Sequence, residues 1–191
     1  QIDINENNIN TMGFIFALTF ILISLAFKFG AAPFHMWIPD VYHGSLISTT
    51  LLLSTLPKIA IFIIILKILA YTFIGLSIFW SDMLIILSVI SIMIGNIVAI
   101  SQQNIKRMLA YSTIANIGFI LLGVSVGLFD GYKASMFYTI TYVITTIAAF
   151  GLVSQLICKE NAIEDINELK GLNSQDPLLA FLLMAIMLSY I

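Results

Sequence analysis

Long hydrophobic runs separated by short polar segments dominate the pattern of this chain. A helix needs about 20 predominantly apolar residues to cross a hydrocarbon core of about 30 Å. Five runs are long enough, and we predict spans at residues 11–42, 45–69, 82–100, 108–128 and 134–157. A further apolar run, 177–191, is too short to cross with ease and is expected to be a partial sixth helix. The pattern predicts an all-α polytopic transmembrane helix bundle, a single domain over residues 1–191.

Two polar segments are expected to lie outside the hydrocarbon core. Residues 1–10 are polar and are expected to be interfacial or disordered. Residues 159–176 form the one long charged segment, which we interpret as a surface linker. Within it, residues 163–169 predict a short amphipathic helix that Gly171 ends, since glycine commonly follows the last turn of a helix.

Short connections between the spans suggest how the chain lies in the membrane. The segment 101–107, SQQNIKR, carries two adjacent basic residues, which place it on the matrix-like side by the positive-inside rule. The loop predicted at 71–81 has no lysine or arginine and is expected on the opposite side, with Trp80 as an interface anchor. Asp-Gly within 129–133 predicts a tight turn between the last two spans.

The first span is too long for one straight helix. At 1.5 Å per residue, residues 11–42 would extend about 48 Å. Gly30, Pro33 and Pro39 explain the excess length, because proline removes a backbone donor and glycine weakens a helix. We expect this helix to be broken near Gly30–Pro33. Non-helical backbone at membrane depth survives only where protein covers it or where it lines water.

The composition agrees with a membrane protein and excludes several other classes. The chain is 60% hydrophobic and 9% charged, with a mean hydropathy of +1.06, whereas a soluble domain is about 25% charged. A net charge of −2 argues against nucleic acid as a partner. The single cysteine, Cys158, excludes an internal disulfide and a cysteine-based metal cluster. Frequent isoleucine, phenylalanine and asparagine favour an AT-rich, organellar gene.

Two lysines within the apolar runs are the strongest candidates for chemistry. Lys28 precedes the predicted break, and Lys58 lies near the middle of the second span. Charges at membrane depth are costly and mark functional sites. Burial disfavours the charged form of a lysine, so that such a group can exchange a proton, as arginine does not. The alternative is that the lysines extend to the headgroups, which is the interpretation we favour for Lys67.

Both histidines of the chain lie between Lys28 and Lys58. His35, just past the break, is a candidate proton relay because imidazole exchanges protons at physiological pH. The alternative for His35, and the favoured interpretation for His43, is a capping or hydrogen-bonding role. Two histidines without a carboxylate cluster predict no metal site. Asp40 is expected to cap a turn. The sequence holds no nucleophile motif, phosphate-binding glycine loop or dinucleotide fingerprint.

Four segments of the chain resemble a known family. They are FKFGAAPFHMWIPDVYHGS at 27–45, PKIAIF at 57–62, NIKRMLAYSTIANIGF at 104–119 and ELKGLN at 168–173. Together they resemble the antiporter-like membrane subunits of NADH:ubiquinone oxidoreductase, respiratory complex I, and look most like chain 2. The resemblance implies a proton-translocating subunit in which Lys28 matches the lysine of a glutamate–lysine pair. Lys58 matches the central lysine.

The resemblance also implies what the protein assembles with. The partner glutamate and the second broken helix of the family would lie outside residues 1–191. We therefore expect a split or partial subunit, with a separate chain supplying the N-terminal helices and the glutamate. The other partners would be membrane-arm subunits of complex I and lipids, in the mitochondrial inner membrane. NADH, FMN, iron–sulfur clusters and ubiquinone are expected in partner subunits, with no cofactor and no redox active site in this chain.

The leading hypothesis is that this chain forms part of a proton path. A proton would move from Lys28 toward Lys58 through water and His35, and onward to a missing acceptor. A second hypothesis is a stand-alone cation/proton antiporter subunit that uses the same lysines. A third is a structural fragment, retained for assembly, whose pumping is lost.

Overall fold

The apolar runs fold into helices, which the computed structural model describes over residues 9–159 and 165–189. The expectations for residues 1–8, 160–164 and 190–191 lie outside the described residues. The helices, in order, are α1 (Ile9–Phe29), α2 (Trp37–Gly44), α3 (Ile47–Lys67), α4 (Ser77–Ile100), α5 (Ile105–Ser125), α6 (Phe129–Lys159), α7 (Leu172–Gln175) and α8 (Pro177–Ser189). A π-helical turn (Ile68–Thr72) and two 3₁₀ turns (Ile74–Leu76 and Ile166–Leu169) complete them.

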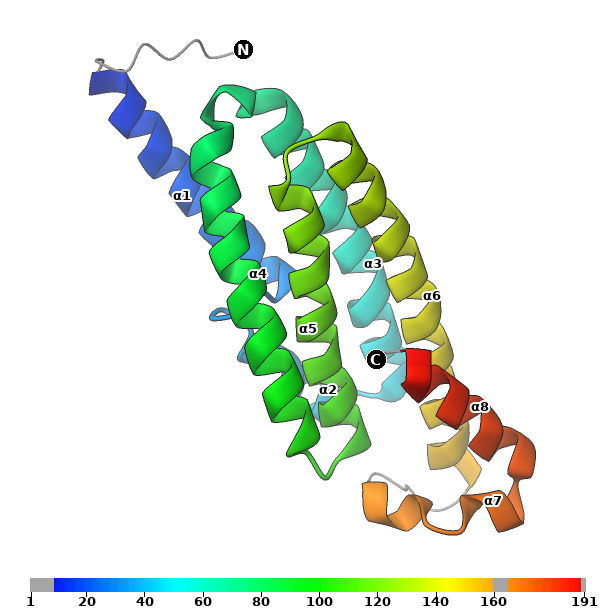
Figure 1. Cartoon of the computed structure of the whole chain (residues 1–191). Coiled ribbons are helices and arrows are strands. Elements are labelled where there is room, and N and C mark those ends of the chain that lie inside the picture. The colour runs from blue at the N-terminus through cyan, green and yellow to red at the C-terminus, as the bar shows by residue number, and fades with distance from the viewer. Residues whose placement is uncertain (1–8, 160–164, 190–191) are drawn as a thin grey trace.

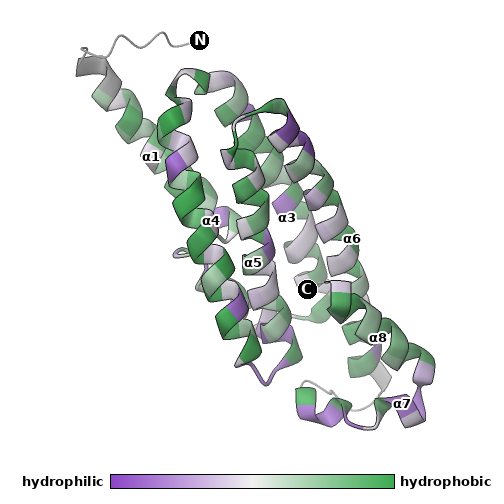
Figure 2. Ribbon diagram, in the orientation of Figure 1, coloured by the Kyte–Doolittle hydropathy of each residue, from purple (hydrophilic) through white to green (hydrophobic). Residues whose placement is uncertain are grey.

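The all-α polytopic fold predicted from the sequence is confirmed. Five helical segments are long and apolar enough to cross a membrane: Met12–Phe29, Ile47–Thr72, Ile74–Ile100, Ile105–Ser125 and Phe129–Ile157. Within the described ranges, regular strands are absent. α3, α4, α5 and α6 run side by side, with α1 beside α4 and α8 leaning against α6 (Figure 1). Hydrophobic residues predominate along these helices (Figure 2), and many large ones are exposed, as expected in lipid.

α5 is the central helix of the bundle. In its membrane-spanning window 67% of the residues are buried, against at most 33% in the other four spans. Glycines let α4 approach it closely: a Cβ at Gly95 would lie 2.6 Å from the backbone nitrogen of Ala115, and one at Gly118 would lie 2.7 Å from Ile92 Cγ1. Gly95 and Gly118 therefore serve close helix packing.

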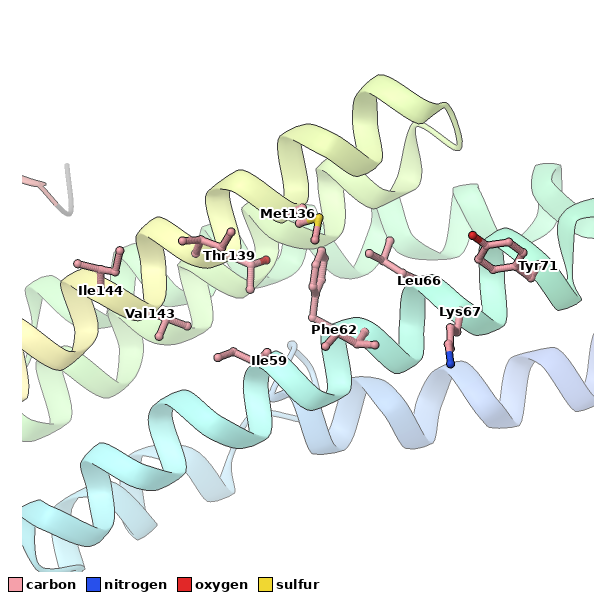
Figure 3. A pocket seen from close by; sticks show the side chains of 11 residues that line it. Ile59, Phe62, Leu66, Lys67, Tyr71, Met136, Thr139, Val143 and Ile144 are labelled. Atoms are coloured by element: carbon pink, nitrogen blue, oxygen red, sulfur yellow. The ribbon is translucent and has the colours of Figure 1, made fainter.

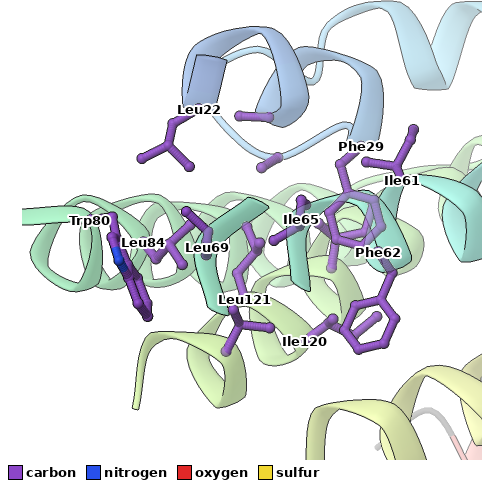
Figure 4. Packing of buried hydrophobic residues seen from close by; sticks show 14 of the residues in the cluster. Leu22, Phe29, Ile61, Phe62, Ile65, Leu69, Trp80, Leu84, Ile120 and Leu121 are labelled. Carbon is purple, nitrogen blue, oxygen red and sulfur yellow. The ribbon is translucent and has the colours of Figure 1, made fainter. Parts of the chain in front are cut away.

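A hydrophobic core joins α1, α3, α4 and α5 toward the end of the bundle where α3 ends and α4 begins (Figure 4). Leu69, Trp80, Leu84 and Leu121 pack together there. The prediction that Trp80 anchors the chain at the membrane interface is wrong. Its side chain is 1% exposed, and its indole Nε1 donates to the carbonyl of Phe73 over 3.0 Å. We call this end of the molecule the Trp80 end.

The opposite end holds the short α4–α5 loop and the start of α3. Asp40 on α2 forms an ion pair with Arg107 on α5 over 3.6 Å. The backbone N–H of Ile166 donates to the carbonyl of Gln103 over 2.9 Å, which joins the following surface segment to the same loop. We call this the Arg107 end. The positive-inside rule predicts that this end lies on the matrix-like side, and that orientation stays a prediction.

Several predicted connections are shorter than expected because the helices extend into them. α4 already begins at Ser77, inside the loop predicted at 71–81. The turn predicted at 129–133 is wrong, since these residues form the first turns of α6. The change of direction occurs at Gly127 instead, whose φ of +69° favours glycine. Lys106 is also not in a polar loop: it lies in the first turn of α5 and is buried.

The charged surface segment also differs from its prediction. The short helix expected over 163–169 is a 3₁₀ turn, Ile166–Leu169, in the described part of that range. Gly171 does follow it, with a φ of +94°, and opens α7.

Candidate functional site

The break in the first apolar unit occurs where the sequence predicted it. α1 ends at Phe29, residues 30–36 are non-helical, and α2 begins at Trp37. Gly30 has a φ of +89°, which L-amino acids with a side chain rarely adopt. The peptide bond between Ala32 and Pro33 is cis. This backbone is buried rather than exposed to lipid: Gly30, Ala31 and Ala32 are all inaccessible.

Backbone groups at and just after the end of α1 find partners on α1 itself, on α2 and on α4. Gly30 N and Ala31 N both donate to the carbonyl of Ala26, over 2.8 and 2.9 Å. The Trp37 indole Nε1 donates to the carbonyl of Phe27 over 2.9 Å. The N–H of Ala32 donates to Ser91 Oγ on α4 over 2.8 Å. These bonds explain how a broken helix is tolerated at membrane depth.

Lys58 binds the last carbonyl of α1. Its Nζ donates to the carbonyl of Phe29 over 2.6 Å, and the side chain is 1% exposed. The same Nζ lies 5.1 Å from the centre of the Trp37 ring, within range of a cation–π interaction. Both the carbonyl end of a helix and an aromatic face favour a positive charge, whereas burial opposes it. Lys58 therefore sits where its charged and neutral forms are both stabilised to some degree.

Gly30 makes room for this arrangement. A Cβ at this position would overlap Cδ1 of Ile38 and would lie 3.4 Å from Lys58 Nζ. Two features therefore require glycine at position 30. One is the positive φ of its backbone, and the other is the close approach of Ile38 and Lys58.

The other predicted relay residues, His35 and Lys28, lie in different environments. His35 is buried, and its ring meets the Tyr111 ring of α5 edge-on, with centroids 6.3 Å apart. Its Nδ1 has no hydrogen-bond partner within the described residues. Lys28 lies in the last turn of α1 with an exposed side chain. The structure therefore places His35 inside the bundle with Lys58, and Lys28 on its outer surface.

The remaining candidate residues lie at the surface of the bundle. Lys67 is exposed near the end of α3, and His43 is exposed in the last turn of α2. Asp40 makes no cap bond at the start of α2 and instead pairs with Arg107, so its expected capping role is wrong. Across the described part of the chain, no group of three histidine, cysteine, aspartate or glutamate side chains could hold a metal ion.

Sequence reasoning missed a row of buried polar groups between Lys58 and the Arg107 end. Thr50 and Ser54 precede Lys58 at intervals of four residues on α3, and both are inaccessible. The Tyr142 hydroxyl of α6 donates to the carbonyl of Ser54 over 3.3 Å. The four-residue spacing of Thr50, Ser54 and Lys58 was the available signal, since it places all three on one helical face. We call Thr50, Ser54, Tyr42 and Tyr142 the polar row.

A second polar contact joins α5 and α6. The Tyr138 hydroxyl donates to Asn116 Oδ1 over 2.6 Å, and Asn116 Nδ2 donates to the carbonyl of Ser112 over 2.8 Å. The polar side chain of Asn116 therefore serves interhelical hydrogen bonding.

A cavity of about 420 Å³ opens between α3 and α6, far less polar than the Lys58 site (Figure 3). Phe62 and Leu66 face Met136 and Val143 across it, and Lys67 and Tyr71 lie at one end. Its lining is almost wholly apolar. Such a groove suits a lipid chain or another helix rather than a polar substrate.

A buried lysine bonded to the broken end of a transmembrane helix is characteristic of membrane proteins that move ions or protons. The whole chain, residues 1–191, matches the protein family described as "NADH:quinone oxidoreductase/Mrp antiporter, TM". The chain belongs to this family.

Curated relatives and a solved structure support this family assignment. The chain is 47% identical over 175 residues to NADH-quinone oxidoreductase subunit N of Thioalkalivibrio sulfidiphilus and 50% identical over 175 residues to that of Coxiella burnetii. Each match covers 92% of this chain but 36% of the relative, so the chain spans little more than a third of their length. A chain of respiratory complex I from Thermus thermophilus is 36% identical over 92% of this chain and 38% of that chain, with a TM-score of 0.75.

A more distant structure shows the same fold. A chain of an archaeal membrane-bound sulfane sulfur reductase is 24% identical, with a TM-score of 0.75 over 85% of this chain. The correspondence in helix arrangement therefore extends beyond the sequences that are closely similar.

Proposed function

We propose that this chain is part of a proton-translocating membrane-arm subunit of respiratory complex I, with Lys58 as its central proton-relay group. The observation that carries the proposal is the full burial of Lys58, mid-way along a transmembrane helix, against the broken end of α1. Relatives named as subunit N of NADH-quinone oxidoreductase support the assignment to complex I. The chain itself would catalyse no redox step and would contribute to NADH:quinone reduction only as a subunit of the H⁺-translocating enzyme.

The surroundings of Lys58 explain how it would respond to an electric field. The carbonyl of Phe29 accepts a hydrogen bond from the ammonium or from the neutral amine, so both protonation states keep a partner. Because burial and the helix end act in opposite directions on the charge, a modest change in the local field shifts the balance. A lysine in this environment gains and releases a proton without losing its position.

Lys28 and His35 complete the proposed relay. Lys28 directly precedes Phe29, whose carbonyl accepts the hydrogen bond from Lys58, so the two lysines meet the same end of α1. His35 offers a buried Nδ1 that is available to a water molecule or a proton. We propose that a proton passes from Lys28 through water and His35 to Lys58.

The family resemblance implies that Lys28 forms a glutamate–lysine pair, so Lys28 requires a carboxylate partner. Within the described residues it forms no ion pair, and its exposed side chain is accessible to a neighbouring helix. We propose that this carboxylate comes from helices outside residues 1–191, as a separate chain of a split subunit would supply it. Other membrane-arm subunits and lipids would cover the outer faces of α1 and α6. NADH, FMN, iron–sulfur clusters and ubiquinone would be bound by partner subunits.

The closer assignment to mitochondrial chain 2, in the mitochondrial inner membrane, stays a prediction. It is supported by the motifs around His35 and Lys58 and by the isoleucine- and asparagine-rich composition. The curated relatives cited above are bacterial. Sequencing the genome compartment that encodes the chain would test the assignment, and a bacterial chromosome would refute it.

The substitution Lys58→Met in the assembled complex tests the proposed function. Methionine keeps an unbranched apolar stem but cannot carry a proton. We expect the number of protons pumped per NADH oxidised to fall, while assembly of the complex changes little. Lys67→Met is the matched control, because Lys67 is an exposed lysine on the same helix. Pumping equal to that of the control in a fully assembled Lys58→Met complex would refute the proposal.

The second candidate function is a cation/proton antiporter subunit, because the family description includes Mrp antiporters. In that case the chain would purify without redox subunits, and Lys58→Met would abolish sodium- or potassium-dependent proton exchange. Purification of the tagged chain with NADH-oxidising subunits would exclude it. A structural fragment without pumping would instead show a normal proton yield in both lysine variants.

A further inference from the structure

We propose that Trp37 is a positioning residue of the relay, which stabilises the charged form of Lys58 through the face of its indole ring. This inference rests on the proposed function, since it concerns how the relay lysine holds a proton inside the bundle. Trp37 lies in the first turn of α2, directly after the break, and its side chain is half-buried. It adds a residue to the proposed relay of Lys28, His35 and Lys58.

The first observation is that the tryptophan and the lysine both bind the broken end of α1. In an unbroken helix the carbonyl of Phe27 would accept from the N–H of Ala31, but Ala31 N donates one residue earlier, over 2.9 Å. The Trp37 indole Nε1 donates to the Phe27 carbonyl instead, over 2.9 Å. Two residues further along α1, the carbonyl of Phe29 accepts from Lys58 Nζ over 2.6 Å. The break therefore brings the two side chains to the same helix end.

The second observation is the orientation of the indole ring. Lys58 Nζ lies over the Trp37 ring, 5.1 Å from its centre, and a cation is attracted to an aromatic face within about 6 Å. The bond from Nε1 to the Phe27 carbonyl holds the ring in this position. The Phe27 ring also packs against it, with centroids 6.2 Å apart and an interplanar angle of 35°. The aromatic face is therefore held toward the lysine by contacts that do not involve the lysine.

The ring contact distinguishes the two protonation states of Lys58. The carbonyl of Phe29 accepts a hydrogen bond from the amine as well as from the ammonium, so this bond exists in both states. The aromatic quadrupole, in contrast, attracts a cation. An equilibrium between two states shifts only by the difference in their interaction energies. Together with the carbonyl end of α1, Trp37 supplies such a difference.

The surroundings of Lys58 make this contribution important. Its side chain is 1% exposed, and among the described residues no carboxylate forms an ion pair with it. A charge that is removed from water and has no opposite charge beside it is destabilising. A cation–π contact is also stronger where it is desolvated than at an exposed surface. The indole ring therefore offsets part of the cost of holding a proton on a buried lysine.

The alternative role for Trp37 is purely structural: the indole would only fill space and fasten α2 to α1. Trp80 provides the comparison that separates the two roles. In both residues the indole Nε1 donates to a backbone carbonyl, over 2.9 Å for Trp37 and 3.0 Å for Trp80. Within the described part of the chain, a cation lies over the ring of Trp37 but not over that of Trp80. A change confined to the ring face should therefore affect pumping at Trp37 alone.

Stepwise fluorination of the Trp37 indole in the assembled complex tests the inference. Ring fluorines withdraw electron density from the aromatic face, which weakens its attraction for a cation, whereas the N–H remains a donor. We expect the rate of proton pumping to fall with each added fluorine, by up to about thirtyfold for a contact of about 2 kcal/mol. The same series at Trp80 is the matched control and should leave pumping unchanged. Equal pumping across the Trp37 series would overturn the inference, since a structural role depends on shape and on the N–H.

Two ordinary substitutions give a second comparison if a fluorinated complex assembles poorly. Trp37→Phe keeps an aromatic face without the indole N–H, and Trp37→Leu removes both. At equal assembly we expect several-fold faster pumping in Trp37→Phe than in Trp37→Leu, and equal rates would overturn the role of the ring. Lys58→Met separates this inference from the proposed function. If Lys58→Met pumps normally, both fail; if Lys58→Met is impaired while the Trp37 comparisons show no difference, only the role of Trp37 fails.

Discussion

Replacing Gly30 by alanine should destabilise the protein, because the backbone at the break does not favour a residue with a side chain. An alanine at a φ of +89° costs about 1–2 kcal/mol, and its Cβ would overlap Ile38 Cδ1, which adds an overpacking cost of about 1–3 kcal/mol. Lower entropy of the unfolded chain offsets about 0.4–1 kcal/mol. The expected net destabilisation is therefore about 2–4 kcal/mol.

The same substitution should also disturb the lysine. Gly30 follows Phe29, whose carbonyl accepts the bond from Lys58 Nζ over 2.6 Å, so relief of the strain moves this acceptor. We expect a lower thermal midpoint of the detergent-purified complex together with reduced pumping. Ile38→Val removes the overlapping methyl group, and the double variant should recover part of both losses.

Gly13→Ala is the control for this prediction. Gly13 lies in the same helix, and a Cβ there meets no other atom within 4 Å. In a helix interior, alanine is favoured over glycine by about 0.5–1 kcal/mol. The reasoning would be refuted if Gly30→Ala proved as stable as Gly13→Ala, or if Ile38→Val failed to improve the Gly30 variant in either measurement.

Two further substitutions test contacts around the break. Ser91→Ala removes the acceptor of the buried Ala32 N–H, so we expect a loss of about 1–3 kcal/mol in stability, measured as a lower denaturation midpoint; an unchanged midpoint would show that the bond does not hold the break to α4. Asp40→Asn breaks an ion pair whose aspartate is largely exposed, and should change stability by less than about 1 kcal/mol. A large loss of stability in that variant would contradict the surface character of the pair.

The broken helix is the part of the site that the sequence predicted most fully. An apolar unit longer than a bilayer needs a break, and glycine and proline determine where one is tolerated. Both arguments use only local properties of the chain, and the structure ends α1 at Phe29 as expected. The burial of Lys58 could be predicted equally well. An ionisable residue near the middle of a long apolar run lies too far from either end to reach the headgroups.

The side chains at the edges of the spans were predicted less well. Trp80 has the composition of an interface anchor, yet it lies in the core because the π-helical and 3₁₀ turns fold the chain back over α3. Asp130 and Gly131 have the composition of a turn, yet they continue α6. In both cases the residue type was compatible with two environments, and the neighbouring helices decided between them.

The sequence by itself determined that the chain is a helical membrane protein, where its first helix breaks, and that Lys58 lies at membrane depth. These properties depend on hydropathy, helix length and the backbone limits of glycine and proline, all of which act within a few turns. Only the tertiary structure decided that Lys58 binds the carbonyl of Phe29 and that Lys28 points outward. It alone showed that the Tyr142 hydroxyl of α6 donates to the carbonyl of Ser54, one turn before Lys58 on α3. Such contacts join residues far apart in the chain, and their geometry follows from how the helices pack against α5.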